Sequence, residues 1–251
     1  MHPGQPSRSY VIWFSQRTGS TLLTAALTGT GVAGRPTEAL NDHDPETLTL
    51  AELHLIWQNN TTPNGVFGLK YGPQRDGLAA WTQCFRRVLN LPDQLSAADV
   101  WAETFPSCRH LFVTRRNKVR LAVSWWRAIQ SGEWHRPQGQ GPSRSVLDQR
   151  ADLEDKYSFE ALHHLFVEAS LREALIEEFF ADAGLHPMTV VYEDFIRDYE
   201  GTVRSVLGFL GLDVPKIILP QALERLADDV SEAWVQRFRL EQQADWTTPA
   251  W

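Results

Sequence analysis

A short segment near the start of the chain gathers the residue types that bind anions. It reads Ser15-Gln-Arg-Thr-Gly-Ser-Thr21, and its hydroxyls, its arginine and its backbone amides can all donate hydrogen bonds. Arg17 adds a fixed positive charge and a planar fork of donors. The residues that we expect to bind an anion here are Ser15, Gln16, Arg17, Thr18, Gly19, Ser20 and Thr21.

The residues on either side of this loop predict how it is held. Tyr10 to Phe14 is a run of aromatic and β-branched residues, which is typical of a buried strand. Leu22 to Leu27 continues at helical spacing, with Ser20 and Thr21 as possible N-caps. A helix N-terminus after a tight loop directs backbone N–H groups and a positive dipole end at one point, which favours phosphate. The alternative is a turn that only joins strand to helix.

The loop differs from the Walker A loop of nucleotide-hydrolysing proteins. That motif places a lysine and then a serine or threonine after its second glycine, and the hydroxyl holds magnesium. Here Gly19 is followed by Ser20 and Thr21, with no lysine. Magnesium-dependent hydrolysis is therefore disfavoured, and a cradle for phosphate or phosphosulfate remains open.

A second candidate anion site comprises Arg116 and Ser124, eight residues apart. An arginine at a strand end and a serine in the second turn of the next helix can face one oxyanion, to which the arginine donates in a bidentate manner. The alternative is that Ser124 bonds only to a carbonyl of its own helix.

Charged residues follow each of the expected strands, which are Tyr10 to Phe14, Val66 to Lys70, Arg109 to Thr114 and Met188 to Tyr192. Helical patterns separate these strands, which indicates crossover connections and a mainly parallel sheet. We expect an α/β, P-loop-like three-layer fold with that sheet in the centre, flanked by helices. Ligands of such sheets bind at the carboxyl ends of the strands, where Arg17, Lys70, Arg115–Arg116 and Glu193–Asp194 would meet.

Composition narrows the class of protein further. The length of 251 residues and the hydrophobic fraction of 43% suit a globular protein, and we expect a single domain over residues 1–251 with a flexible N-terminus at 1–8. The net charge of −7 argues against a nucleic-acid scaffold. Cys84 and Cys108 are too few for a disulfide framework or a cysteine metal site. With neither a signal peptide nor a membrane-spanning run, we expect a cytoplasmic protein without a transmembrane segment.

The segment Ser15 to Leu23, together with Gly31 to Glu38, resembles the Stf0-type carbohydrate sulfotransferases. Val191-Tyr-Glu-Asp194 is similar to a segment recurrent in sulfotransferases. The resemblance implies 3′-phosphoadenosine 5′-phosphosulfate (PAPS) as co-substrate, no metal, and Arg116 with Ser124 on the 3′-phosphate. It also implies a small-molecule or glycolipid hydroxyl as acceptor and a homodimer. We expect residues 132–150 to form a mobile loop on the acceptor side.

The expected catalytic residues are Glu38, Arg17 and Lys70. Arg17 and Lys70 would neutralise the transferring and leaving oxygens, and the resemblance implies Glu38 as the base. Many other sulfotransferases place a histidine base shortly after the lysine, but Lys70 is followed by Tyr-Gly-Pro73. Glu38 matches the acidic base of the Stf0 type, and a solvated surface carboxylate is the alternative interpretation. Arg35 or Glu38 could instead orient a sugar hydroxyl, and His43 or His135 would be the next candidates for the base.

These observations predict a sulfotransferase that moves the sulfuryl group of PAPS to a carbohydrate or glycoconjugate hydroxyl by in-line, metal-independent transfer. Two other classes stay open. One is a P-loop-like kinase of small molecules, although its lysine and magnesium pattern are missing. The other is a nucleotide-binding module without catalysis.

Overall fold

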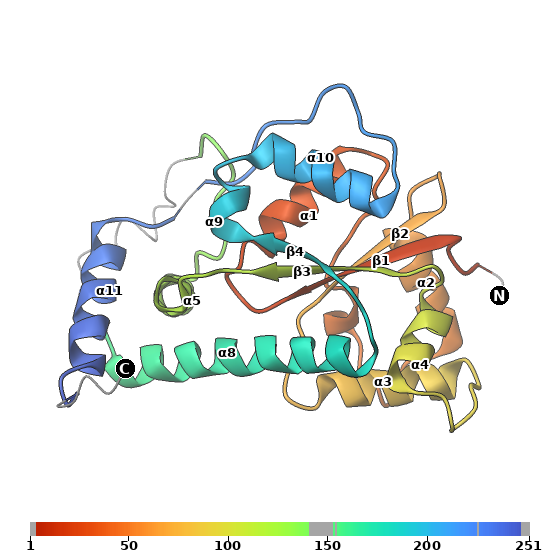
Figure 1. Cartoon of the computed structure of the whole chain (residues 1–251), viewed down its shortest axis with the longest axis horizontal. Helices are drawn as coiled ribbons and strands as arrows, with labels where there is room; N and C mark the ends of the chain where they lie inside the picture. Colours follow the sequence, from red (N-terminus) through yellow and green to blue (C-terminus); the bar gives the residue numbers. More distant parts are fainter. Residues whose placement is uncertain (1–3, 141–152, 154, 225, 247–251) are drawn as a thin grey trace.

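A parallel sheet forms the centre of the molecule in the computed structural model, which describes residues 4–140, 153, 155–224 and 226–246. Within these residues the sheet has four strands in the order β2-β1-β3-β4, and each pairs with its neighbour in parallel (Figure 1). The strands are β1 (Arg8–Phe14), β2 (Val66–Tyr71), β3 (Arg109–Thr114) and β4 (Met188–Val191). The structure confirms the expected α/β class.

Helices cover both faces of the sheet, which explains why the middle of each strand is mostly apolar. In β1, Ile12 faces one core and Trp13 the other, and both are fully buried. One face carries α1 (Ser20–Gly29), α9 (Tyr192–Phe195) and α10 (Tyr199–Leu210). The opposite face carries α2 (Leu50–Asn60), α3 (Gly77–Val88), α4 (Ala97–Thr104) and part of α8 (Phe159–Asp182).

A third apolar cluster lies beyond the carboxyl ends of the strands. It joins α5 (Lys118–Ser131), the first half of α8 and α11 (Asp229–Gln242). A short 3-10 helix, η1 (Ala39–Asp42), follows the connection after α1. None of the helices within the described residues is both long and apolar enough to cross a bilayer.

One expectation about local structure is corrected, and one helix was not expected. Neither Ser20 nor Thr21 caps α1, because Gly19 occupies the N-cap position in the left-handed region at φ 86° and Ser20 is already helical. Helix α4 has no counterpart in the sequence prediction, although Ser96 and Asp99 form a capping box at its start.

The expected flexible segments lie partly outside the described residues, which exclude 1–3 and 141–150. The described part of the loop, 132–140, is hydrogen-bonded to a segment before α11. The amide of Gln138 donates to the carbonyl of Ala222 (2.8 Å), and the amide of Glu224 donates to that of Arg136 (2.9 Å). The flexibility of both segments and the single domain stay predictions.

Candidate active site

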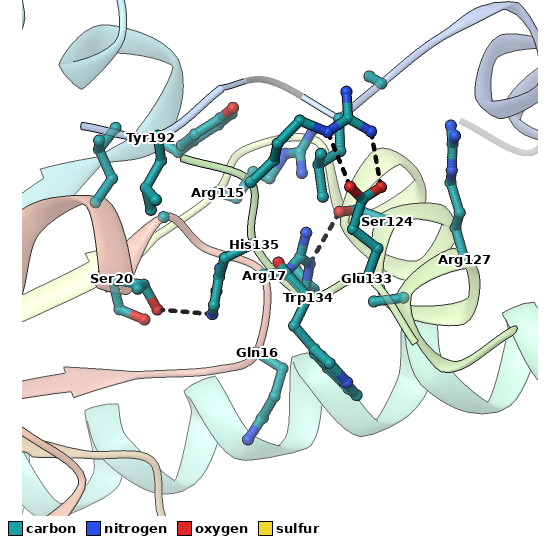
Figure 2. A pocket seen from close by; sticks show the side chains of 18 of the residues that line it. Gln16, Arg17, Ser20, Arg115, Ser124, Arg127, Glu133, Trp134, His135 and Tyr192 are labelled. Atoms are coloured by element: carbon teal, nitrogen blue, oxygen red, sulfur yellow. Dashed lines mark hydrogen bonds and ion pairs between the residues drawn. The ribbon is translucent and has the colours of Figure 1, made fainter. Parts of the chain in front are cut away.

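A pocket of about 400 Å³ opens at the carboxyl ends of the strands, where the charged residues were expected to meet (Figure 2). The loop after β1, the end of β2, helix α5, residues 133–136 and the segment before α11 line it. Six cationic and three acidic residues belong to this lining, namely Arg17, Lys70, Arg115, Arg120, Arg127, Arg136, Glu38, Glu133 and Glu224. In a chain of net charge −7, this excess of positive charge favours an anionic ligand.

Arg17 connects the loop after β1 with the opposite wall of the pocket. Its Nε donates to Ser124 Oγ on α5 (3.0 Å), and its Nη1 donates to the carbonyl of Trp134 (Figure 2). Burial and the neighbouring Arg115 lower the pKa of the Arg17 guanidinium to about 10, so it is still charged at neutral pH. Among the described residues no carboxylate forms an ion pair with Arg17.

Gly19 lies where no other residue fits without a shift in the structure. Its φ of 86° is in the left-handed region, and an added Cβ would lie 2.6 Å from Cδ2 of Tyr192. The Arg115 guanidinium stacks over the same Tyr192 ring, 4.7 Å from its centroid. Tyr192 therefore packs against both the loop after β1 and the residue that follows β3.

Lys70, at the end of β2, lies between a hydroxyl and a carboxylate. Its Nζ is 3.0 Å from Thr21 Oγ1 and 2.6 Å from Glu38 Oε1. The Lys70 side chain is 7% exposed and that of Glu38 37%. Burial lowers the pKa of the Lys70 ammonium, and the contact with Glu38 opposes that shift.

Glu38 is held beside β2 by the backbone. The amide of Lys70 donates to the carbonyl of Thr37 (2.9 Å), which extends the sheet by one bridge. Asn41 Nδ2 donates to Glu38 Oε2 (2.8 Å), so both carboxylate oxygens have a partner. These contacts place a carboxylate at the pocket wall, directly next to Lys70.

His135 contacts the same threonine hydroxyl as Lys70. Its Nε2 is 3.3 Å from Thr21 Oγ1 (Figure 2). Partial burial and the charges of Arg17 and Lys70 lower the pKa of His135 to about 4. The imidazole is therefore neutral at physiological pH and can accept a proton.

Comparison with known proteins identifies the family. The model of the Stf0 sulphotransferase family matches residues 9–241. The chain belongs to the Stf0 sulphotransferase family. It is 30% identical to the trehalose 2-sulfotransferase of Mycolicibacterium smegmatis over 94% of this chain and 96% of that protein. The identity to the trehalose 2-sulfotransferase of Mycobacterium tuberculosis is also 30%, over 93% of this chain and 95% of that protein.

The fold agrees with the family. A sulfotransferase from Alicyclobacillus acidocaldarius superposes with a TM-score of 0.50 over 94% of each chain, at 14% identity. The expected P-loop-like fold is thereby confirmed.

In this Stf0 sulphotransferase, the predicted anion loop divides between pocket and interior. Gln16, Arg17, Gly19, Ser20 and Thr21 line the pocket. Ser15 and Thr18, by contrast, are fully buried. Ser15 Oγ donates to Glu173 Oε1 (2.8 Å) and Thr18 Oγ1 donates to the carbonyl of Ser15 (2.8 Å). Both hydroxyls therefore have partners in the interior and do not line the pocket, and the assignment of Ser15 and Thr18 to the anion stays a prediction.

The structure does not bring the Arg116 side chain to Ser124, and the binding of one 3′-phosphate by these two residues stays a prediction. The Arg116 guanidinium binds both carboxylate oxygens of Asp194 and lies outside the pocket lining, with 59% of its side chain exposed. Ser124 does line the pocket, but its hydroxyl accepts from Arg17. Because Asp194 follows β4 beside β3, it offers Arg116 a bidentate partner on the outer surface.

Arg115 takes the place in the pocket that was expected for Arg116. The amides of Arg116 and Asn117 donate to the Glu193 carboxylate (3.0 and 3.2 Å), which fixes the turn after β3. The adjacent arginines point in different directions as a result. The dipeptide Arg115-Arg116 was a signal for this position, but its side-chain directions depend on residues far away in the sequence.

Three further pocket arginines were missed by sequence reasoning. Each pairs with a carboxylate from the C-terminal part of the chain; the pairs are Arg120 with Glu232 (2.7 Å), Arg127 with Asp228, and Arg136 with Glu224 (3.7 Å). These pairs connect the wall made by α5 and residues 133–136 with α11 and the segment before it. The described residues bring together no group of three or more His, Cys, Asp or Glu side chains that could hold a metal ion.

Proposed function

We propose that this protein transfers the sulfuryl group of PAPS to a hydroxyl of a carbohydrate or glycoconjugate, by in-line displacement without a metal. Its membership of the Stf0 family and its relatives, two trehalose 2-sulfotransferases, support a sugar acceptor. The observation that carries the proposal is Lys70, whose Nζ joins Thr21 to Glu38 at the wall of a cationic pocket.

The residues present fit PAPS as a co-substrate. PAPS carries a phosphosulfate and a separate 3′-phosphate, and the pocket offers cations along two walls. On one wall we assign Gln16, Arg17, Gly19, Ser20 and Thr21 to the phosphosulfate, with the N-terminus of α1 behind them. On the other wall we assign Arg115 and Ser124 to the 3′-phosphate, in place of the pair predicted from the sequence.

Glu38 is the base in this proposal. Its Oε1 lies 2.6 Å from the ammonium of Lys70, and a carboxylate in this position can accept a proton from a neighbouring hydroxyl. As the acceptor oxygen bonds to sulfur, the bond from sulfur to the 5′-phosphate oxygen breaks and Glu38 takes the acceptor proton. Negative charge then grows on the phosphate oxygen, which Arg17 and the amides at the start of α1 stabilise.

The test is product analysis with the purified protein. It is incubated with PAPS and a panel of mono- and disaccharides that includes trehalose, with and without a magnesium chelator, and products are identified by mass spectrometry. We expect a sulfated sugar and an equal amount of adenosine 3′,5′-bisphosphate, also with chelator. Phosphorylation that needs ATP and magnesium would instead indicate a kinase, and PAPS binding without any product a non-catalytic module.

A further inference from the structure

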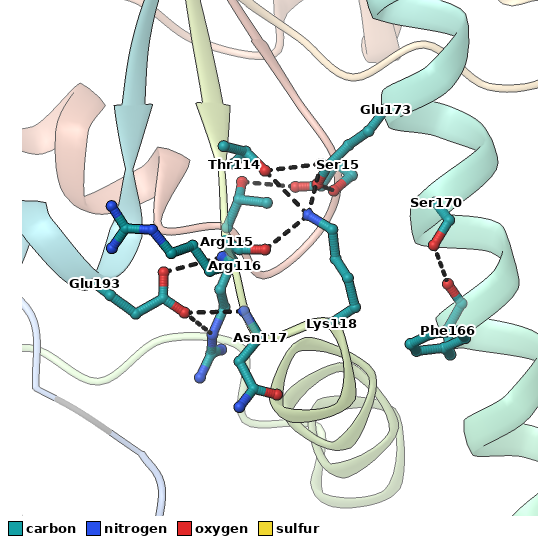
Figure 3. A network of polar contacts seen from close by, with 11 residues as sticks. Ser15, Thr114, Arg115, Arg116, Asn117, Lys118, Phe166, Ser170, Glu173 and Glu193 are labelled. Atoms are coloured by element: carbon teal, nitrogen blue, oxygen red, sulfur yellow. Dashed lines mark hydrogen bonds and ion pairs between the residues drawn. The ribbon is translucent and has the colours of Figure 1, made fainter. Parts of the chain in front are cut away.

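A buried carboxylate outside the pocket joins the two loops that form it. Glu173, in the middle of α8, is 7% exposed. Its Oε1 accepts from Ser15 Oγ (2.8 Å), and its Oε2 accepts from Thr114 Oγ1 (2.7 Å) and from Lys118 Nζ (2.6 Å) (Figure 3). Three donors from two separate parts of the chain therefore meet on one side chain.

These donors come from the two segments that present the pocket cations. Ser15 begins the loop that carries Arg17, and Thr114 ends β3, directly before Arg115. Lys118 Nζ also donates to the carbonyl of Arg115 (2.7 Å) (Figure 3). Glu173 thus contacts Ser15 in the loop that carries Arg17, and Lys118 contacts the backbone of Arg115.

Helix α8 contacts the same loop a second time. Arg172, adjacent to Glu173, donates from Nη1 to Gln16 Oε1 (2.6 Å). Its guanidinium also lies over the Trp125 ring of α5, 5.2 Å from the centroid. Two consecutive residues of α8 therefore hold two consecutive residues of the loop, Ser15 and Gln16.

We infer that Glu173 and Lys118 are positioning residues, which set the distance between the segments of Arg17 and Arg115 to fit the two anionic ends of the donor. The inference rests on the proposed function, because it assigns these segments to one doubly anionic co-substrate. Glu173 is buried and the Lys118 side chain is 23% exposed. Such a largely buried ion pair is a costly way to fill an interior, since apolar residues of similar size are often as stable. Here the pair makes directional contacts with both segments, which apolar side chains cannot do.

The test separates positioning from stability with a paired substitution. Glu173→Leu with Lys118→Met removes both charges of the pair at once, so neither is left unpaired. Ser15→Ala removes one contact to Glu173 and leaves the pair in place. Glu177→Gln, on an exposed position of the same helix, is the matched control. Each protein is measured for melting temperature, for the KM of donor and acceptor, and for the affinity of adenosine 3′,5′-bisphosphate.

We expect the paired variant to melt near wild type but to raise the donor KM by about tenfold or more, with a similar loss of bisphosphate affinity. The acceptor KM should stay within about twofold of wild type, because the Glu38 wall does not contact this network. Ser15→Ala should weaken the bisphosphate in the wild-type background and have little further effect in the paired variant. Loss of stability alone would lower kcat and leave both KM values unchanged.

Wild-type donor KM and bisphosphate affinity in the paired variant would overturn the inference. If that variant does not fold, Ser15→Ala decides the matter, and unchanged bisphosphate affinity there would also overturn it. The bisphosphate measurement needs no turnover. A wild-type protein that binds the bisphosphate through this network but sulfates no sugar would contradict the proposed function and not the positioning role.

Discussion

Lys70 is a buried lysine whose ammonium contacts a carboxylate. Burial lowers the pKa of its ammonium, while Glu38 at 2.6 Å opposes the shift. Only one partner of this ion pair is accessible, because 37% of the Glu38 side chain is exposed and Glu38 lines the pocket. A carboxylate that is accessible and held beside a cation suits a base that must meet an acceptor from solution.

Glu38→Gln should leave folding and donor binding nearly intact and lower kcat by about a hundred- to ten-thousand-fold. Glutamine keeps the size and an acceptor for Lys70 but cannot take the proton. Turnover with saturating PAPS measures the effect, and Glu46→Gln, at an exposed position in the same connection, is the control. A variant within about threefold of wild type, or roughly 0.6 kcal/mol, would exclude Glu38 as the base and leave His135 as the next candidate.

The sequence predicts that Arg116 binds the 3′-phosphate, whereas in the structure its neighbour Arg115 lines the pocket. Arg115→Ala should weaken binding of adenosine 3′,5′-bisphosphate by about 1.5 to 3 kcal/mol, the range for hydrogen bonds to charged groups. Arg116→Ala should have a much smaller effect, because its partner is the exposed Asp194. Calorimetry on both variants, with AMP as the comparison ligand, measures the difference. The reverse order would support the role predicted for Arg116 from the sequence.

The loop between β1 and α1 is shaped by backbone geometry as much as by its side chains. Arg17 has a positive φ of 63° and Gly19 one of 86°, which turns the chain sharply between strand and helix. Such conformations cost free energy for residues with a Cβ and persist where neighbours hold them. Here Ser124 and Trp134 hold Arg17, and the Tyr192 ring covers Gly19.

Gly19→Ala should therefore have two effects: backbone strain at a positive φ, and a clash of the new Cβ with the Tyr192 ring beside the pocket. The matched control is Gly31→Ala, at φ 71° with nothing within 4 Å of an added Cβ. Both substitutions should cost about 1 to 2 kcal/mol of stability. Only Gly19→Ala should also weaken bisphosphate binding, by about tenfold or more, because Tyr192 or the loop must move. Thermal melting and calorimetry on both variants test this, and equal affinities would show that the ring contact is unimportant.

The whole molecule is held by aromatic packing as well as by the sheet. Trp13 of β1 contacts Trp101, Phe179 and Phe180 between the sheet and the helices below it. His110 of β3 lies in this layer, 8% exposed, and accepts from Trp13 Nε1 at Nδ1 (3.0 Å). Burial lowers the pKa of His110 to about 4, so the ring is neutral in the folded protein.

This histidine should make the protein less stable in acid. The unfolded chain binds a proton at His110 near pH 6.5, whereas the folded protein does so only near pH 4. As the pH falls between these values the unfolded state is favoured, so the free energy of unfolding decreases, by up to about 3 kcal/mol. Urea unfolding at about pH 7 and about pH 4.5 should show a smaller decrease for His110→Gln than for wild type. Carboxylates titrate in both proteins, so equal decreases would mean that His110 does not contribute.

The sequence alone determined the four strands, most of the helices and the family. Strand β3 has the ends that its apolar run predicted, Arg109–Thr114, because a strand buried on both faces leaves a local hydrophobic pattern. The order of strands and helices indicated a parallel sheet with its ligand site at the carboxyl ends. The loop from Ser15 to Thr21 indicated the family, because backbone turn, helix start and hydroxyls lie within one short segment.

Only the tertiary structure decided which side chains reach the pocket. Ser15 points inward because it donates a hydrogen bond to Glu173, which lies 158 positions away in the sequence. Arg116 points outward because it donates to Asp194, which lies 78 positions away. A local sequence pattern cannot specify such partners, since the fold determines which donors and acceptors lie within hydrogen-bond distance of each side chain. The direction of a polar side chain follows from that competition, whereas the position of its Cα follows from the element that carries it.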